Sequence, residues 1–205
     1  MHNETLAPET RRVLETVAQQ SCIARFYLAG GTALALQIGH RESVDLDFFS
    51  AEDFKRDELK TALAACGRYV LVSEEEGTLD GSLDDVKLSF LRYEYPMLFP
   101  LIFFEGIHLA DIRDIACMKL DAVSSRGSKK DFIDIFFLLK QFSLEELIGF
   151  FEKKYSHIQY NKLHILKSLT YFSEAEDEPL PKMLTEVSWE TVKEKMREEA
   201  KKFVS

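Results

Sequence analysis

The first half of the chain carries short stretches in which hydrophobic residues alternate with polar ones. Stretches of this kind, rich in aromatic and β-branched residues, predict strands at residues 25–29, 44–49, 69–73, 86–93 and within 98–107. A different pattern precedes them, because Val13, Leu14 and Val17 recur at helical spacing and predict a helix over 8–20. This mixture of helices and strands predicts a mixed helix-and-strand domain over residues 1–109.

The second half has the pattern of helices. The segments DIRDIACMKLDAVSSRG, KKDFIDIFFLLKQF and SLEELIGFFEKKY all follow the 3.6-residue period of an amphipathic helix. The acidic stretch EAEDEPLP predicts a loop, and residues 189–203 predict a charged terminal helix. We therefore expect a helical region over residues 110–205.

Two residue pairs predict sharp changes of direction. Gly30 and Gly31 follow the first predicted strand, and Thr32 is placed to cap the short helix that comes next. The Asp80-Gly81 pair predicts a turn between two later strands.

The composition restricts the possible functions. The chain has 205 residues, 46% of them hydrophobic, and a formal net charge of −9, so it is long enough for a full core and its long-range field repels polyanions. Contact with nucleic acid must therefore be local, and RGSKK at 126–130 is the strongest basic cluster. Three scattered cysteines indicate neither a disulfide framework nor a zinc site, and neither a signal peptide pattern nor a membrane-spanning stretch is recognised. These features predict a cytoplasmic protein without a membrane partner.

The segment FYLAGGTALALQIGHRESVDLDFF places two aspartates within a predicted strand. Side chains alternate along a strand, so Asp45 and Asp47 lie on one face while Val44, Leu46 and Phe48 face the core. At a separation of about 6 to 7 Å, two carboxylates repel by roughly 2.5 kcal/mol. A hard divalent cation, Mg²⁺ or Mn²⁺, offsets this repulsion and takes oxygen ligands. The pair is therefore a candidate metal site.

The glycine pair of the same segment suits an anionic ligand. Without a Cβ atom, the backbone of Gly30 and Gly31 can approach a ligand closely, and a helix that starts near Thr32 directs N–H groups and its positive dipole end at an anion. Each feature alone is more often a simple turn or a solvated strand edge. Their combination favours a metal-bound nucleoside triphosphate.

Charged residues also share helix faces in the second half. Lys119 and Arg126 are seven residues apart, and Asp131 and Asp134 are three apart, so each pair lies on one face of its helix. Together they could form one charged wall of a phosphate-binding site. The alternative is an ordinary wet surface, with Lys130 and Asp134 as an i,i+4 pair that contributes roughly a few tenths of a kcal/mol.

Two blocks of the sequence, taken together and in order, resemble a known enzyme family. The block GGTALAL…GHRESVDLDFFS resembles the first motif of nucleotidyltransferases with a DNA polymerase β-like fold. This resemblance implies the α+β class, with a mixed sheet and flanking helices followed by a helical C-terminal half. The block MKLDAVSSRGSKKDFIDIFFLL is similar to the helical lysine motif and the Lys-Asp-x-x-Asp motif of AbiEii/AbiGii-type nucleotidyltransferase toxins. The resemblance spans residues 26–139, about half of the chain.

The resemblance implies a metal-dependent enzyme that transfers a nucleoside monophosphate from an NTP to an acceptor, with release of pyrophosphate. It also implies a toxin-like protein that acts on RNA, such as the acceptor end of tRNA, and a cognate antitoxin protein as a possible partner. The implied catalytic residues are Asp45, Asp47, Lys119, Asp131 and Asp134, with Asp45 and Asp47 as the ligands of Mg²⁺ or Mn²⁺. The implied nucleotide contacts are Gly30, Gly31, Thr32, Lys119, Arg126 and Lys130.

The chain departs from the wider fold at one position. Many members carry a third carboxylate on a later strand, which helps to bind metal and can activate the attacking hydroxyl, and Ser89 stands at that place. Asp85 could substitute for it, Asp131 and Asp134 could complete the site from the helical half, or the site is weakened. Two alternatives therefore stay open: a nucleotide-binding or interaction protein that has lost activity, and a transferase that modifies a small hydroxylated molecule.

Overall fold

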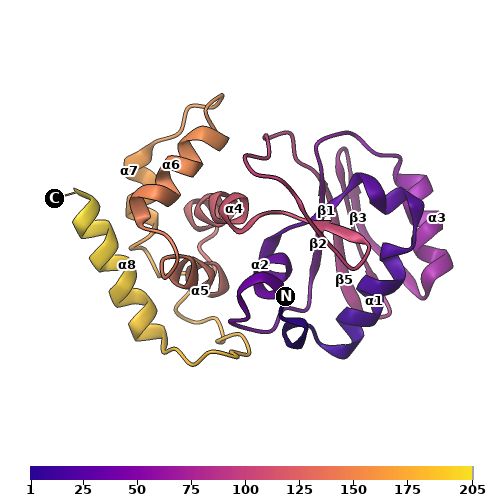
Figure 1. Ribbon diagram of the computed structural model, residues 1–205, viewed down its shortest axis with the longest axis horizontal. Coiled ribbons are helices and arrows are strands. Elements are labelled where there is room, and N and C mark those ends of the chain that lie inside the picture. Colours follow the sequence, from indigo (N-terminus) through magenta and orange to yellow (C-terminus); the bar gives the residue numbers. More distant parts are fainter. Residues whose placement is uncertain (205) are drawn as a thin grey trace. The chain divides into compact units, whose positions relative to one another are not determined.

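The computed structural model describes residues 1–204, which divide into two compact units, Met1–Asp111 and the helices from Ile112 onward (Figure 1). The first unit contains the sheet and the second is helical. In the described part of the chain, every helix is too short or too polar to cross a membrane.

A mixed sheet, seven-stranded in the described residues, forms the first unit. Its strands are β1 (Tyr27–Leu28), β2 (Leu46–Ser50), β3 (Tyr69–Glu75), β4 (Thr78–Leu83), β5 (Val86–Arg92), β6 (Ile102–Phe104) and β7 (Ile107–Leu109). They lie in the order β3-β4-β5-β2-β1-β7-β6. Strand β2 pairs in parallel with β5, and β1 with β7, whereas the other pairs are antiparallel. This sheet confirms the predicted α+β class.

Helices flank this sheet. They are α1 (Pro8–Ala18), α2 (Gly30–Ile38) and α3 (Arg56–Cys66), with short 3₁₀ turns η1 (Asn3–Thr5) and η2 (Ser21–Arg25). In Figure 1, α1 and α3 lie on one side of the strands and α2 lies on the other. The buried face of α1 consists of Thr10, Val13, Leu14 and Val17, which confirms the helical period expected there.

Aromatic side chains form the centre of this unit's core. Phe48 on β2 stacks on Phe90 on β5 with ring centroids 5.0 Å apart, because the parallel register places these two residues side by side. Phe26 meets Phe90 edge-on at 5.2 Å and Phe54 at 5.1 Å. All four rings are buried, so they hold the two central strands together.

The glycine turn differs from the prediction at both ends. The first strand is limited to Tyr27–Leu28, because Ser21–Arg25 form η2 instead. Helix α2 begins at Gly30 with Ala29 as its N-cap, so Thr32 lies inside the first turn and does not cap the helix. The helix starts early because Gly30 adopts a φ of +65°, which lets the chain turn sharply after β1.

The acidic strand starts later than predicted. Strand β2 begins at Leu46, and Val44, which we expected to face the core, is 54% exposed. The chain before β2 pairs with the N-terminal segment, where the N–H of Ser43 donates to the carbonyl of Thr5 at 2.9 Å. Because of this pairing the chain enters the sheet only after Asp45.

The predicted turn at Asp80-Gly81 is wrong. Both residues lie inside β4, and the turn that joins β4 to β5 falls at Asp84-Asp85, where both φ angles are positive. Packing requires the glycine instead, since a Cβ atom added to Gly81 would lie 2.6 Å from Cε2 of Tyr69 on β3. Here an Asp-Gly pair marks a close approach between neighbouring strands.

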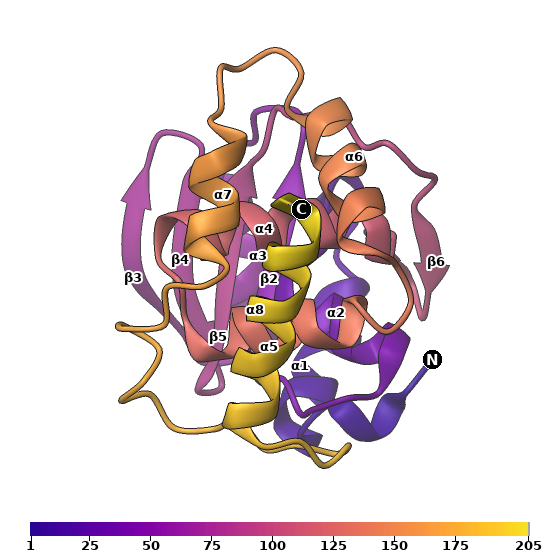
Figure 2. The same cartoon turned by 90° about the vertical axis from the view of Figure 1, so that its left-hand side faces the viewer.

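The second unit is built from α4 (Ile112–Ser125), α5 (Lys129–Leu138), α6 (Leu144–Lys154), α7 (Lys162–Ser168) and α8 (Trp189–Val204). Helix α4 packs against α5, α6 and α7, and α8 packs against α5 and α6 (Figure 2). Ser143 and Glu146 form a reciprocal capping box at the start of α6. The sequence pattern therefore predicted α4, α5, α6 and the terminal helix α8 correctly, whereas it singled out no segment that corresponds to α7.

Removing the ring of Phe90 should destabilise the first unit strongly. Phe90→Ala is expected to lower the free energy of unfolding by about 3–5 kcal/mol, because the ring is buried against Phe48 and Phe26 and leaves a cavity. Phe103→Ala, at a ring that is 69% exposed, should change it by less than about 0.5 kcal/mol. Denaturant unfolding followed by circular dichroism measures both, and equal losses would contradict this core.

Candidate functional site

The carboxylate of Asp47 lies against the glycine turn that begins α2. A Cβ atom added to Gly30 would lie 2.6 Å from Oδ2 of Asp47, closer than side chains approach in folded proteins. The backbones are joined as well, since the N–H of Ala29 donates to the carbonyl of Asp47 at 3.0 Å. Two motifs singled out in the sequence, the glycine pair and the second aspartate, therefore meet in one place.

Thr32 links the same turn to the first aspartate. Its side chain is buried, and Oγ1 lies 2.8 Å from Oγ of Ser43 and donates to the carbonyl oxygen of Asp45. The hydroxyl is thus used to hold the acidic segment in place. For a ligand, the first turn of α2 offers the backbone N–H groups of Gly30, Gly31 and Thr32.

The loop before β2 closes over the second glycine. Arg41 is buried, and a Cβ atom added to Gly31 would collide with its Nη2. Its Nη1 donates to the carbonyl of Glu42 at 3.0 Å, and the neighbouring His40 is fully buried. These two residues shape the loop, and the guanidinium adds positive charge beside the N-terminus of α2.

The donor set at this turn suits a hard cation. Asp45 and Asp47 are half-buried carboxylates, which fit Mg²⁺ or Mn²⁺ when waters and phosphate oxygens complete the coordination shell. Among the described residues, no cluster of three or more His, Cys, Asp and Glu side chains is arranged to bind a metal. A cation held by these carboxylates would take its remaining ligands from water and phosphate.

The sheet defines the place of the third carboxylate found in related folds. The parallel register sets Asp47 beside Ser89, so the serine occupies the neighbouring position on the same face. Asp85 does not substitute for it, because it lies in the turn before β5, is 81% exposed and pairs with Arg68 at 2.5 Å. It stands four residues before Ser89, about 13 Å away along the strand.

The register also brings in an aspartate that the sequence analysis missed. Asp80 on β4 pairs with Ser89, so Asp47, Ser89 and Asp80 form one row across three neighbouring strands. Interpreting Asp80-Gly81 as a turn concealed this residue. The alternating pattern of TLDGSL was the signal that could have revealed it.

The charged residues of the second block form one buried network in the helical unit. Lys119 on α4 contacts Asp131 at 2.8 Å and Asp134 at 2.6 Å, both on α5, and all three side chains are at most 5% exposed. Asp131 also accepts hydrogen bonds from Nε of Arg126 at 3.0 Å and from Oγ of Ser128 at 2.6 Å. The helix faces inferred from the spacing do come together, as an internal ion cluster and not as a wet surface.

The basic cluster RGSKK is not a continuous patch. Lys129 is buried, its Nζ donates to the carbonyl oxygens of Glu176 and Glu178, and its N–H donates to the Glu178 carboxylate at 2.7 Å. The side chain of Arg126 is 63% exposed, and Lys130 is exposed. Two cations of the cluster thus reach solvent, while the third anchors the loop between α7 and α8.

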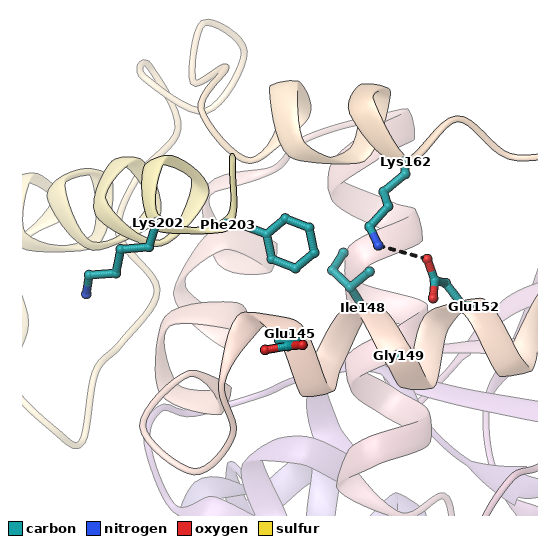
Figure 3. A pocket seen from close by; sticks show the side chains of 7 residues that line it. All are labelled: Glu145, Ile148, Gly149, Glu152, Lys162, Lys202 and Phe203. Carbon is teal, nitrogen blue, oxygen red and sulfur yellow. Dashed lines mark hydrogen bonds and ion pairs between the residues drawn. The ribbon is translucent and has the colours of Figure 1, made fainter. Parts of the chain in front are cut away.

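A cavity of about 400 Å³ lies between α6, α7 and α8 (Figure 3). An ion pair between Lys162 and Glu152, 3.0 Å long, crosses one side of it. The lining residues are Glu145, Ile148, Gly149, Glu152, Lys162, Lys202 and Phe203. Residues of both charges mix there, and none of the predicted site residues is among them.

Lys119→Met should destabilise the helical unit strongly. Removing the ammonium group takes away the buried cation that Asp131 and Asp134 both contact, which costs about 3–5 kcal/mol of unfolding free energy. Lys130→Met, at an exposed neighbour, should change that energy by less than about 0.5 kcal/mol. Chemical unfolding monitored by the fluorescence of Trp189 measures both, and an equally stable Lys119→Met protein would rule out this role of the network.

Acid should weaken the same network below about pH 4. Burial raises the pKa of Asp131, whereas Lys119 and Arg126 lower it more strongly, to about 2 from an ordinary value of 3.8. The ionised carboxylate therefore stabilises the folded state above about pH 4, and this contribution is lost as the pH falls through about 2. Unfolding free energies measured over this range should fall more steeply for the unaltered protein than for Asp131→Asn, and parallel curves would contradict the ion cluster.

Comparison with known proteins finds a family and a relative that resemble this chain. The chain matches the family described as Nucleotidyl transferase AbiEii toxin, Type IV TA system, over residues 12–99. That range contains the glycine turn and the strands β2, β4 and β5. A protein of Aquifex aeolicus (strain VF5), described as uncharacterized, is 38% identical over 211 residues, which cover 97% of this chain and 98% of that protein.

Solved structures agree in fold. A candidate nucleotidyltransferase from H. pylori has a TM-score of 0.58 at 19% identity, with 95% of this chain and 94% of that chain covered. MenT4, a nucleotidyltransferase toxin from Mycobacterium tuberculosis H37Rv, has a TM-score of 0.55 at 15% identity, with 95% and 86% covered. At these identities the likeness concerns the fold, which is the polymerase β-like nucleotidyltransferase fold that the motifs indicated. The family match shows that residues 12–99 of this chain form a domain of the AbiEii nucleotidyltransferase toxin family, and the solved structures agree with it in fold.

Proposed function

We propose that this protein transfers a nucleoside monophosphate from an NTP to a hydroxyl group of an RNA acceptor of the tRNA class. In this reaction the acceptor oxygen bonds to the α-phosphorus, the bond from that phosphorus to the bridging oxygen breaks, and pyrophosphate leaves. The acceptor hydroxyl loses its proton. Membership of the AbiEii nucleotidyltransferase toxin family supports the reaction class.

The contact between Asp47 and the glycine turn carries the proposal. A carboxylate that lies against Gly30 stands next to the free N–H groups at the start of α2. One place therefore offers oxygen ligands for a cation and hydrogen-bond donors for phosphate oxygens. An NTP with its divalent cation needs both kinds of group within a few bond lengths.

In the first unit, different residues would bind the triphosphate and the cation. The backbone N–H groups of Gly30, Gly31 and Thr32 would donate to the triphosphate, and the guanidinium of Arg41 adds positive charge beside them. Asp45 and Asp47 would hold Mg²⁺ or Mn²⁺, which when bound neutralises phosphate charge. Thr32 keeps these two groups together through its bond to the Asp45 carbonyl.

The helical unit contributes through its buried network. The motifs imply catalytic roles for Lys119, Asp131 and Asp134, and their mutual burial supports a positioning role within the proposed enzyme. Asp131 orients Arg126, whose side chain extends into solvent. We propose Arg126 and Lys130 as the nucleotide or acceptor contacts of this unit.

The choice of acceptor and partner rests on the toxin family. A net charge of −9 restricts RNA contacts to a local set of exposed cations, such as those of Arg126 and Lys130. The cytoplasm, where NTP and tRNA occur together, is the proposed place of action. A cognate antitoxin protein that blocks the enzyme is the proposed partner.

Asp47→Asn tests the proposed site. Incubation with each labelled NTP, Mg²⁺ and total tRNA should give label transfer that falls by at least about 100-fold in this variant, because the amide keeps the shape but loses the charge that binds the cation. Asp57→Asn is the matched control, since that carboxylate is 95% exposed on α3, and it should transfer label at the unaltered rate.

Other outcomes separate the alternatives. Label transfer to an aminoglycoside but not to tRNA would replace the RNA acceptor with a small hydroxylated molecule. NTP binding without transfer to any acceptor would identify a protein that only binds nucleotides. Unchanged transfer by Asp47→Asn would overturn the site, and absence of NTP binding would overturn the proposed function.

A further inference from the structure

The row of side chains beside Asp47 has a serine where a carboxylate is expected. Strands β2, β5 and β4 are neighbours, and their register aligns Asp47 with Ser89 and Ser89 with Asp80. Paired residues point to the same face of a sheet, so the three side chains stand in one line. Two strand spacings, about 10 Å between Cα atoms, separate Asp47 from Asp80, and the small side chain of Ser89 lies between them.

Asp80 is unusual for its place in the sheet. Aspartate is disfavoured in strands, and β4 has a neighbour on each side. On the far side the register shifts along β3, because Leu71 pairs with Gly81 while Ser73, and not Val72, pairs with Asp80. An extra residue of this kind is a β-bulge, a feature that redirects side chains and is enriched next to active sites.

The shift gives Asp80 a hydrogen-bond donor. Oγ of Ser73 donates to Oδ2 of Asp80 at 3.0 Å, whereas a regular register would place the apolar Val72 there. Within the described residues, the bond from Ser73 uses only the Oδ2 oxygen of the Asp80 carboxylate, so its Oδ1 oxygen is left for a ligand. The serine therefore fixes the direction of the carboxylate.

We propose that Asp80, on the neighbouring strand β4, accepts the proton of the attacking hydroxyl. Ser89 cannot take this role, because it has no carboxylate. This inference rests on the proposed function. The acceptor hydroxyl lies above Ser89, and its proton passes to Oδ1 of Asp80 while its oxygen bonds to the α-phosphorus. The bond from that phosphorus to the bridging oxygen breaks, and pyrophosphate leaves with the electron pair. Ser73 is a positioning residue in this step.

The spacing favours this role over metal binding. Carboxylates on Cα atoms about 10 Å apart are too far separated to share one small cation directly. Asp80 thus touches the acceptor, and NTP binding should not depend on it.

Asp80→Asn and a second-site rescue test this assignment. Transfer of labelled nucleotide to tRNA should fall by at least about 100-fold in Asp80→Asn. The rate of the unaltered protein should decrease at acidic pH, and this decrease should be absent from the pH profile of Asp80→Asn. NTP affinity, measured by calorimetry, should stay within about twofold of the unaltered protein. Adding Ser89→Asp to Asp80→Asn returns a carboxylate to the row. The double variant should transfer label at least about tenfold faster than Asp80→Asn alone.

The controls come from the same strands. Asp85→Asn, in the turn before β5, should keep full activity, and Ser73→Ala should lower the rate less than Asp80→Asn does. Activity of Asp80→Asn close to that of the unaltered protein would overturn the assignment. So would a loss of NTP affinity in Asp80→Asn that matches its loss of rate, because this would mark a structural role.

Failure of this inference differs from failure of the proposed function. If the unaltered protein transfers label and Asp47→Asn does not, the proposed function stands, and only the Asp80 variants decide the inference. If the unaltered protein transfers nothing to any acceptor, both are overturned together.

Discussion

The close approach of the Asp47 carboxylate to the first turn of α2 constrains the rest of the sheet unit. It excludes any side chain at position 30, and bonds from Ala29 and Thr32 to the backbone of the acidic segment hold the helix and strand together. Strand β2 then sets the register of β5, and β5 sets that of β4. One short contact thereby fixes where Ser89 and, one strand further, the next acid stand.

Local patterns predicted those parts of the fold that local interactions determine. The helical period located α1 and the terminal helix, and the alternation of β5 was visible directly. The errors fall where distant partners override the local signal. Val44 faces solvent because the chain beside it pairs with the N-terminal segment, and Gly81 serves the ring of Tyr69 instead of a turn. Neither partner could be read from neighbouring residues.

The same distinction applies to the site. Asp45 and Asp47 are two residues apart, so strand geometry alone made them a candidate pair. The ion cluster of Lys119 could also be anticipated from the sequence, because helical spacing placed the charged residues of each segment on one face of its helix. The role of Asp80 depends on the register of three strands and on a bulge in a fourth, and no spacing within the chain encodes either. Burial of Lys129 was likewise hidden, since its partners lie almost fifty residues away.

That lysine gives the acidic loop between α7 and α8 an internal anchor. The ammonium group of Lys129 donates hydrogen bonds to the carbonyl oxygens of Glu176 and Glu178. It also lies over the ring of Trp189, which packs edge-on against Phe132. A protease must draw a segment out into an extended strand before it can cut, and these bonds oppose that motion. The longest stretch of the helical unit without regular structure should therefore survive limited digestion, although its length and polarity suggest an easy cleavage site.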